Sequence, residues 1–401
     1  LALEHADPLS EEDRHSVSFA SEAGKAIDYY VVPAPTMDDA IAGYRRLTGN
    51  APMMPKWAFG FWQSRQRYNT QAELLHVVSA YRDAEIPIDN IVQDWFYWPE
   101  DSWGCHCFDP ARFPDPAGMV REVHDQDARI MISVWPKFYP TTAHAKELAA
   151  GGYLYERPLE ADQLDWVGQG YPNTFYDPYA REAREIYWRQ MRETLMPMGF
   201  DAWWMDATEP DWHSNLSVEE RKYQMTSPAT DIPGAAIFNS YPLPHAEGVA
   251  NGLREAQPDK RPFILTRSGF GGVQRASAAL WSGDVAARWD DLRDQISAGL
   301  NLSLAGVPHW THDIGGFSLE NRYSQEDPEH LPEWRELYTR WFQFGAFSPL
   351  FRSHGEFPYR EIYEISPDGS DMRKSMVWYD ELRYRLMPYI YTQAANTWFD
   401  N

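Results

Sequence analysis

The sequence predicts an α/β fold, a (β/α)8 TIM barrel with long βα-loop insertions, and three observations lead to that prediction. Eight short apolar or aromatic runs recur along the 401 residues, and helical patterns separate several of them, as parallel strands joined by crossover helices require. The runs are continuously apolar, which is typical of strands buried on both faces. The hydrophobic fraction of 43% supplies a large core. Eight units favour a closed barrel, and a doubly wound open sheet is the alternative.

The elements of the barrel are expected in order along the chain. The strands are predicted at residues 58–64, 90–97, 130–136, 202–207, 262–267, 278–284, 307–313 and 347–354. The helices between them are predicted at 72–82, 117–125, 180–196, 289–304 and 334–344, and a final helix at 376–398 closes the barrel. Two connecting stretches, 139–175 and 210–260, are long, so we expect them to be insertions on the functional rim.

The start of the chain has a different pattern. Runs at 16–20 and 27–32 are expected to be strands without partners, so we interpret residues 1–36 as the tail of an N-terminal β-sandwich domain. Residues 37–56 are predicted to form a linker helix, at 38–47, and a connector, and residues 57–401 the barrel. Because the chain begins with Leu1 and not with Met, we expect it to be a piece of a longer protein.

Charge and composition limit the partners of the protein. The formal net charge of −23 argues against nucleic acid, since phosphate binding needs a positive surface. No apolar run reaches membrane-spanning length, so no membrane partner is expected. Cys105 and Cys107 are separated by one residue, which we expect to be too close for an easy disulfide and too short a spacing for a metal site. His309 and His312 have a spacing that resembles metal ligands, but on a strand they would face opposite sides.

Polar residues gather where the predicted strands end, which is where barrels carry their chemistry. The acids Asp94, Asp206 and Asp284 follow three of the strands. Arg267 and His354 follow two more, and tryptophans accompany most of them. Glycoside hydrolysis needs two carboxyl groups that act on the glycosidic bond. It also needs aromatic side chains that line the sugar site and polar groups that hydrogen-bond the sugar hydroxyls. The 18 tryptophans suit sugar rings, although a tryptophan-rich core would explain them equally well.

The two carboxyl groups must differ in protonation. Asp206 ends an apolar strand after two tryptophans, a fixed and dry setting that suits a nucleophile, and Arg267 on the next strand could keep its pKa low. Asp284 follows Ser282 and Gly283 on a loop, so it could approach the leaving group from the other side as a proton donor with a raised pKa.

Four motifs in chain order resemble glycoside hydrolase family 31. Residues 204–209 resemble its Trp-x-Asp-Met-Asn-Glu signature but depart from it at Ala207 and Thr208, where many members carry Met and Asn. Residues 281–284 resemble the Trp-x-Gly-Asp acid/base segment. Residues 312–317 match the motif of strand seven, and residues 352–355 resemble the Arg-x-His-Gly of strand eight. The resemblance runs from about residue 53 to the end, and the opening segment resembles the end of the family's β-sandwich.

The resemblance implies a role for each matching residue. Asp206 would be the nucleophile and Asp284 the acid/base. The non-reducing sugar would be hydrogen-bonded by Asp94, Arg267 and His354, and walled by Trp135, Trp204 and Trp281. Family members use no metal and no organic cofactor, so neither is expected here.

Substrate preference depends on the residues after Asp94. Typical α-glucosidases of the family read roughly Asp-Ile-Asp, whereas this chain reads Asp94-Trp95-Phe96. Xylose is glucose without the C6 hydroxymethyl group, and an aromatic at Trp95 should reject that group by steric clash. Residues 90–98 and 55–64 also look like the bacterial α-xylosidases that act on xyloglucan oligosaccharides. The expected function is therefore a retaining, exo-acting α-xylosidase with an oligosaccharide substrate.

Several alternatives share these residues. An α-glucosidase, an α-galactosidase or an α-transglycosylase could use the same scaffold. A non-catalytic carbohydrate-binding protein could keep the barrel, although both carboxylates argue against it. A purely structural module has no need for buried carboxylates at strand ends. The sequence leaves the oligomeric state open, and a periplasmic, cell-surface or secreted location in a bacterium is expected over a cytoplasmic one.

Overall fold

The computed structural model describes residues 2–4, 18–168, 170–210, 216–324 and 328–400. Its centre is a sheet of eight parallel strands in the order β11-β10-β9-β8-β5-β4-β3-β12. The strands are β3 (Phe61–Gln63), β4 (Asn90–Gln93), β5 (Arg129–Val134), β8 (Ala202–Met205), β9 (Ile264–Thr266), β10 (Ala278–Trp281), β11 (Trp310–Thr311) and β12 (Phe351–Ser353).

The two outer strands of this sheet nearly close the barrel. The amide of Leu350, just before β12, donates to the carbonyl of Trp310 on β11 at 3.1 Å. Nearer the carboxyl ends of the same two strands, a parallel bridge joins Ile314, which follows β11, to Ser353 at the end of β12. The predicted (β/α)8 TIM barrel is confirmed, and the open doubly wound sheet is wrong.

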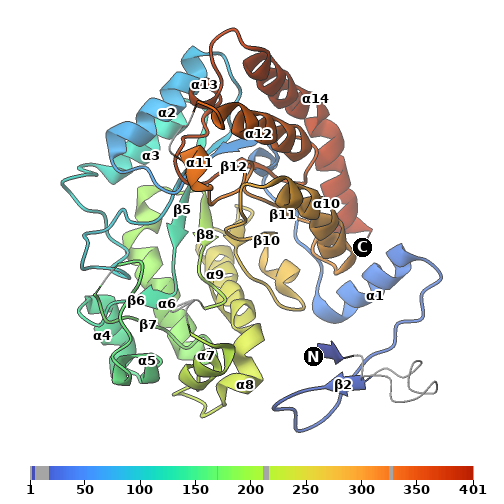
Figure 1. Cartoon of the computed structure of the whole chain (residues 1–401). Helices are drawn as coiled ribbons and strands as arrows, with labels where there is room; N and C mark the ends of the chain where they lie inside the picture. The colour runs from blue at the N-terminus through green and yellow to red at the C-terminus, as the bar shows by residue number, and fades with distance from the viewer. Residues whose placement is uncertain (1, 5–17, 169, 211–215, 325–327, 401) are drawn as a thin grey trace.

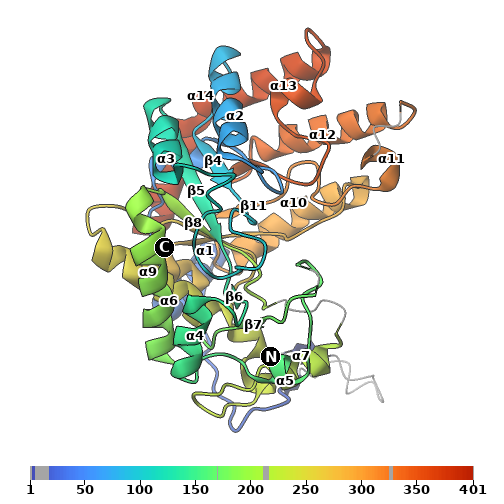
Figure 2. The same cartoon turned by 90° about the vertical axis from the view of Figure 1, so that its left-hand side faces the viewer.

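Helices surround the strands, as Figures 1 and 2 show from two directions. The long helices of this layer are α2 (Gln71–Asp83), α3 (Pro116–Asp125), α6 (Arg181–Thr194), α9 (Pro242–Ala256), α10 (Trp289–Leu304), α12 (Leu331–Gly345) and α14 (Asp371–Phe399). Helix α1 (Met37–Thr48) precedes the barrel, and short turns of helix lie at η2 (Lys56–Phe59), η3 (Met196–Met198), η5 (Val273–Ala276), α11 (Asn321–Ser324) and α13 (Ile362–Ile365). In the described ranges, none of the helices combines the length and apolar character needed to cross a bilayer.

Helix α2 illustrates why these segments are helical. The side chain of Thr70 accepts a hydrogen bond from the amide of Glu73, which satisfies an unpaired donor of the first turn. The buried residues Leu74, Val77, Val78 and Tyr81 recur at helical spacing and face the sheet. The residues predicted as helical at 72–82 are therefore helical for two independent reasons.

Two segments interrupt the alternation of strands and helices. The first contains β6 (Lys137–Phe138), α4 (Ala143–Ala150), α5 (Arg157–Glu160) and β7 (Thr174–Phe175), with β6 and β7 antiparallel. The second contains α7 (Val218–Gln224), α8 (Gly234–Ile237) and η4 (Phe238–Ser240). The insertion predicted at 210–260 is too long, because its last third is α9, which packs against α6 and β9 as a barrel helix.

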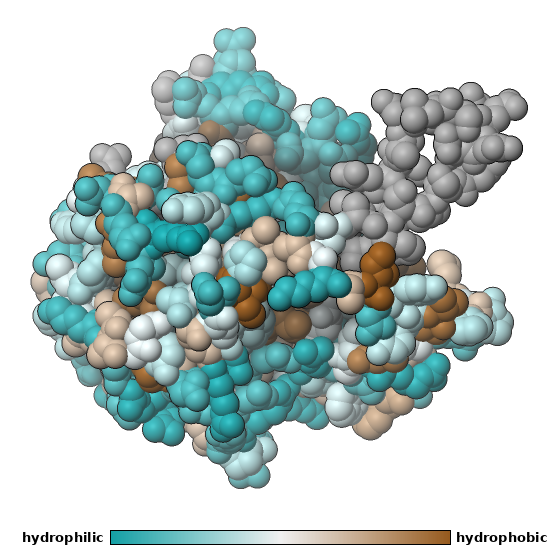
Figure 3. Space-filling view, turned by 90° about the horizontal axis from the view of Figure 1, so that it is seen from below, coloured by the Kyte–Doolittle hydropathy of each residue, from teal (hydrophilic) through white to brown (hydrophobic). Residues whose placement is uncertain are grey.

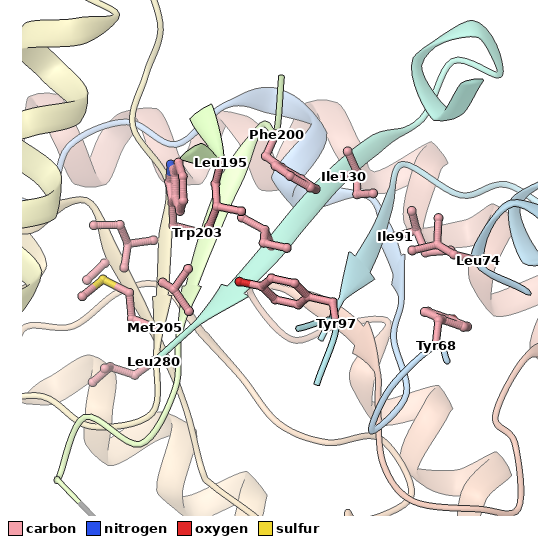
Figure 4. Close-up of a cluster of buried hydrophobic side chains, with 14 of the residues drawn as sticks. Tyr68, Leu74, Ile91, Tyr97, Ile130, Leu195, Phe200, Trp203, Met205 and Leu280 are labelled. Atoms are coloured by element: carbon pink, nitrogen blue, oxygen red, sulfur yellow. The ribbon is translucent and has the colours of Figure 1, made fainter. Parts of the chain in front are cut away.

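The strands alternate their side chains between two cores. On β8, Trp203 points outward and packs with residues such as Leu195 and Phe200, as Figure 4 shows. The next residue, Trp204, points into the barrel and packs in a separate cluster with Trp62 and Trp281. The surface seen in Figure 3 is mostly hydrophilic, with hydrophobic residues in small separate areas.

Three predictions for the first part of the chain are wrong. Residues 27–32 form no strand, and Tyr29, Tyr30 and Val31 are exposed. The strand predicted at 16–20 does have a partner, because β2 (Ser18–Ala20) pairs antiparallel with β1 (Ala2–Glu4); residues 16 and 17 lie outside the described residues. The first predicted barrel strand is shorter than expected, because its beginning is the turn of η2.

Cys105 and Cys107 form a disulfide, which corrects the prediction that one intervening residue is too short a spacing. Gly104 and His106 adopt φ angles of 89° and 49°, so the chain turns tightly around the two cysteines. The resulting Cα separation of 5.2 Å lies within the ordinary range for a disulfide.

Candidate active site

The predicted site residues meet at one end of the barrel. Asp206 directly follows β8, Arg267 follows β9, and Asp284 lies three residues after β10. Asp94 follows β4, and His354 follows β12. Because all eight strands are parallel, their carboxyl ends share one edge of the barrel.

Arg267 holds the acidic groups together. Its Nε lies 3.3 Å from Oδ1 of Asp206, and its Nη1 lies 3.3 Å from Oδ2 of Asp284. Its Nη2 pairs with Oε1 of Glu209. One guanidinium therefore contacts both predicted catalytic carboxyl groups, and the pairing of β8 with β9 and β9 with β10 makes this possible.

The two catalytic candidates lie in different surroundings. The Asp206 side chain is only 11% exposed, and its Oδ1 accepts a hydrogen bond of 2.7 Å from the amide of Ala207. The Asp284 side chain is 46% exposed. A buried, fixed carboxylate beside a more open one fits an attacking group and a proton donor that faces the leaving group.

Burial raises the pKa of both carboxyl groups. It raises the pKa of Asp206 to about 7, although Arg267 acts in the opposite direction. Partial burial also raises the pKa of Asp284 to about 6, again against Arg267. Arg267 thus lowers the pKa of Asp206 as predicted, but removal from water outweighs it and the nearby Asp284 raises this pKa further. The prediction that Asp206 has a low pKa is therefore wrong, whereas the raised pKa predicted for Asp284 is found.

These shifts predict a bell-shaped pH dependence of kcat/KM. The reaction needs Asp206 ionised and Asp284 protonated. The pair holds a single proton mainly between pH values of about 6 and 7, and the higher pKa of Asp206 places that proton mostly on Asp206, so the reactive form is the less populated arrangement of the singly protonated pair. Below this range both groups are protonated, and above it both are ionised, so kcat/KM should fall about tenfold per pH unit on either side. Measuring kcat/KM from pH 4 to pH 9 checks this. An acidic limb at the ordinary carboxyl value of about 4 would contradict it.

Asp94 and His354 form a second polar pair. Oδ1 of Asp94 accepts a hydrogen bond of 2.7 Å from the amide of Trp95, and its Oδ2 lies 3.7 Å from Nε2 of His354. The Nδ1 of His354 makes a 2.7 Å hydrogen bond with Oγ of Ser64. Burial and the nearby guanidinium of Arg352 lower the pKa of His354 well below its usual value, so the ring is neutral. A neutral imidazole and a carboxylate oxygen can bind sugar hydroxyl groups.

The predicted aromatic residues divide into two groups. Trp204 and Trp281 are buried, with ring centres 5.0 Å apart, and Trp204 lies 4.8 Å from the ring of His354. Trp95 and Trp135 are only partly buried, and both contact Trp103. The indole N–H groups of Trp204 and Trp281 have no hydrogen-bond acceptor among the described residues.

Sequence reasoning missed three contributors to the site. Arg352 pairs with Asp313, and its guanidinium carbon lies 4.7 Å from the centre of the Trp204 ring. Both charged residues lie in motifs found in the sequence, but no role was predicted for them. Trp103 links Trp95 to Trp135, and the unusual density of tryptophan after β4 was the available signal. Arg67 lies over Trp95, and nothing in the sequence pattern marked it.

The described residues contain no group of three or more metal-binding side chains. His309 packs edge-on against Phe59, with ring centres 5.8 Å apart. His312 bonds to Oγ of Ser348 and accepts a hydrogen bond from the indole of Trp341. Both histidines therefore have structural contacts.

Comparison with known proteins identifies the family of the chain. The model of the TIM-barrel domain of the glycosyl hydrolases family 31 matches residues 51–393. The chain belongs to glycosyl hydrolase family 31. The recognition made from the four motifs is confirmed.

Individual relatives of this family 31 barrel carry two kinds of name. An α-xylosidase from Saccharolobus solfataricus is 39% identical over 96% of the chain and 49% of that protein. An uncharacterized family 31 glucosidase from Pseudescherichia vulneris is 33% identical over 86% of the chain and 61% of that protein. The crystal structure of a family 31 α-xylosidase from Xanthomonas citri superposes with a TM-score of 0.89 at 59% identity, covering 91% of the chain and 40% of that structure. The chain thus spans about half the length of the relatives it matches.

Proposed function

We propose that the chain is the catalytic barrel of a retaining, exo-acting α-xylosidase that releases α-linked xylose from xyloglucan-type oligosaccharides. The observation that carries this proposal is the pair Trp95 and Phe96, which follows Asp94 where α-glucosidases of the family have a smaller residue and a second acid. The names of the α-xylosidase relatives support it.

The contact of two carboxyl groups with one guanidinium supports a retaining mechanism. In retaining glycosidases the carboxyl groups stand about 5–5.5 Å apart, closer than in inverting enzymes, which leave room for a water molecule. Asp206 would attack the anomeric carbon while Asp284 protonates the leaving oxygen. Asp284, now ionised, would then take a proton from water as that water releases the sugar from Asp206. Two inversions give net retention, and no cofactor takes part.

The position of Trp95 supports a preference for xylose. Its backbone amide donates to Asp94, the proposed hydroxyl ligand, so Trp95 is joined directly to a residue of the proposed sugar site. Its ring stacks on Trp103, with centres 5.6 Å apart and planes at 24°. In the proposed binding mode, an indole held in this way would fill the space that a hydroxymethyl group on C5 of the sugar needs, whereas a pentose lacks that group.

The specificity proposal predicts the behaviour of a Trp95→Ala variant. We expect the wild-type protein to prefer an aryl α-xyloside over the matched α-glucoside, and Trp95→Ala to shift the ratio of kcat/KM toward the glucoside by about 10-fold or more, the usual range for one misfitting group. Trp378→Ala, which removes a half-exposed tryptophan on α14, serves as the matched control. A wild-type preference for the α-glucoside would refute the xyloside assignment and leave the fold and the carboxyl pair intact.

The glucosidase name of one relative makes α-glucosidase the second candidate. Transglycosylation differs from hydrolysis only in whether a sugar or water accepts the glycosyl group from Asp206. Product analysis with added acceptor oligosaccharide separates these outcomes, because a transglycosylase yields longer products and a hydrolase yields free xylose.

A further inference from the structure

Trp95 is held by contacts with three flat side chains, which are its neighbour Phe96, Arg67 and Trp103. The ring centres of Trp95 and Phe96 lie 5.6 Å apart. The guanidinium carbon of Arg67, which follows β3, lies 4.7 Å from the centre of the Trp95 ring and 4.9 Å from that of Phe96. Trp103 stacks on Trp95 as described above. Because Trp95 is only partly buried where it packs against the core, we expect these contacts to contribute to the orientation of its ring.

Arg67 differs from its neighbour Arg112 in what it binds. Arg112 also lies over Phe96, but its N–H groups donate to the carbonyls of Phe96 and Trp98, both at 2.6 Å, and to Asp109 at 2.8 Å. Within the described part of the chain, Arg67 makes no hydrogen bond or ion pair with a side chain or carbonyl, and its contacts are with the two rings. Arg112 therefore holds the backbone of the loop, whereas Arg67 acts on its aromatic side chains.

Arg67 remains positively charged although it is partly buried near the proposed sugar site. Burial and the nearby Arg112 lower the pKa of Arg67, while Asp94 acts in the opposite direction. An arginine side chain nevertheless stays protonated at neutral pH. A half-buried guanidinium over an indole is attracted electrostatically by the ring face, most strongly for tryptophan. The planar group can also stack on the ring in a way that a lysine cannot.

We propose that Arg67 is a positioning residue for substrate specificity, which holds the indole of Trp95 in the orientation that excludes a C6 hydroxymethyl group. This inference rests on the proposed role of Trp95. Without Arg67 the indole loses one of its three flat contacts and turns away more often, so the larger sugar enters more readily.

A double-mutant cycle between positions 67 and 95 tests the inference. The ratio of kcat/KM for matched aryl α-xyloside and α-glucoside is measured for the full-length protein and for Arg67→Met, Trp95→Ala and the double variant. Arg67→Met should lower the xyloside preference by about 3- to 10-fold, as expected for losing one partly desolvated cation–π contact. In the Trp95→Ala background the same change should have no further effect. Arg67→Lys should restore only part of the preference.

A matched control removes an arginine that contacts a tryptophan far from the site. Arg385 lies 5.7 Å from the centre of Trp378 on α14, so Arg385→Met should leave the ratio unchanged. An unchanged ratio in both Arg67→Met and Arg67→Lys would overturn the inference. An equal loss in both backgrounds would overturn it too, because Arg67 would then act on the sugar directly. Failure of the underlying proposal is distinguishable, since Trp95→Ala itself would then leave the preference unchanged.

Discussion

Replacing Asp206 by Ala is expected to lower kcat for an aryl α-xyloside by about 10⁴-fold or more, because without the attacking carboxylate no glycosyl–enzyme ester can form. The fold should persist, since Arg267 keeps its contacts with Glu209 and Asp284. Binding of xylose should also persist, because the proposed hydroxyl ligands Asp94 and His354 are unchanged. Turnover near the wild-type rate would refute the assignment. Loss of turnover together with unchanged binding would also separate an enzyme from a binding protein.

Added azide distinguishes the two carboxyl roles. In Asp206→Ala the small anion can occupy the position of the lost carboxylate and attack the sugar from that side, which inverts the anomeric centre and gives the β-azide. In Asp284→Ala, Asp206 still forms the ester when the leaving group needs no proton, and azide then attacks the ester to give the α-azide. The same anomer from both variants would contradict the assignment of nucleophile and acid/base.

The largest effect on stability is expected from replacing Arg383, which lies on α14 and is fully buried. Its guanidinium donates to the carbonyls of Phe59, Ala346, Ser348 and Pro349 at 2.5–3.0 Å. These carbonyls precede β3 and β12, so one side chain ties the entry of the first barrel strand to that of the last. Burial lowers the pKa of Arg383 to about 10, which leaves it charged at neutral pH.

Arg383→Met should lower the free energy of unfolding by about 3–5 kcal/mol. The change leaves four carbonyl oxygens without this donor and leaves the buried Asp380 without its nearby positive charge. Urea denaturation followed by tryptophan fluorescence measures the loss. Arg385→Met, two residues along the same helix and exposed, should change it by less than about 0.5 kcal/mol. Equal denaturation midpoints for the two variants would refute the role given to Arg383.

The barrel could be predicted from the sequence because each buried strand is an uninterrupted apolar run. The run at 202–207 shows this, since β8 occupies its first four residues and Asp206 comes directly after them. The carboxyl ends of parallel strands then bring Asp206, Arg267 and Asp284 to one edge. Which atoms meet could not be predicted, because the three-way contact of Arg267 depends on the register of β8, β9 and β10.

The failures have equally local causes. The apolar residues at 27–32 satisfy a strand pattern, but a strand needs a neighbour, and none pairs with this segment among the described residues. The disulfide was missed because spacing alone does not show that Gly104 and His106 adopt left-handed backbone angles. Arg67 was missed because its partners are the faces of aromatic rings, which leave no pattern in the sequence.

The stack that begins at Trp95 continues beyond the loop that carries it. Trp103 contacts Trp135 and lies 3.9 Å from the ammonium group of Lys137, which pairs with the buried Asp165 of the first insertion. Together with Arg67, these contacts come from the segments that follow three consecutive strands, β3, β4 and β5. Given the proposed role of Trp95, complete conversion to a larger sugar, during evolution or by engineering, should require these loops to be exchanged together. A single substitution at Trp95 opens space for a larger sugar without creating the contacts that would hold it.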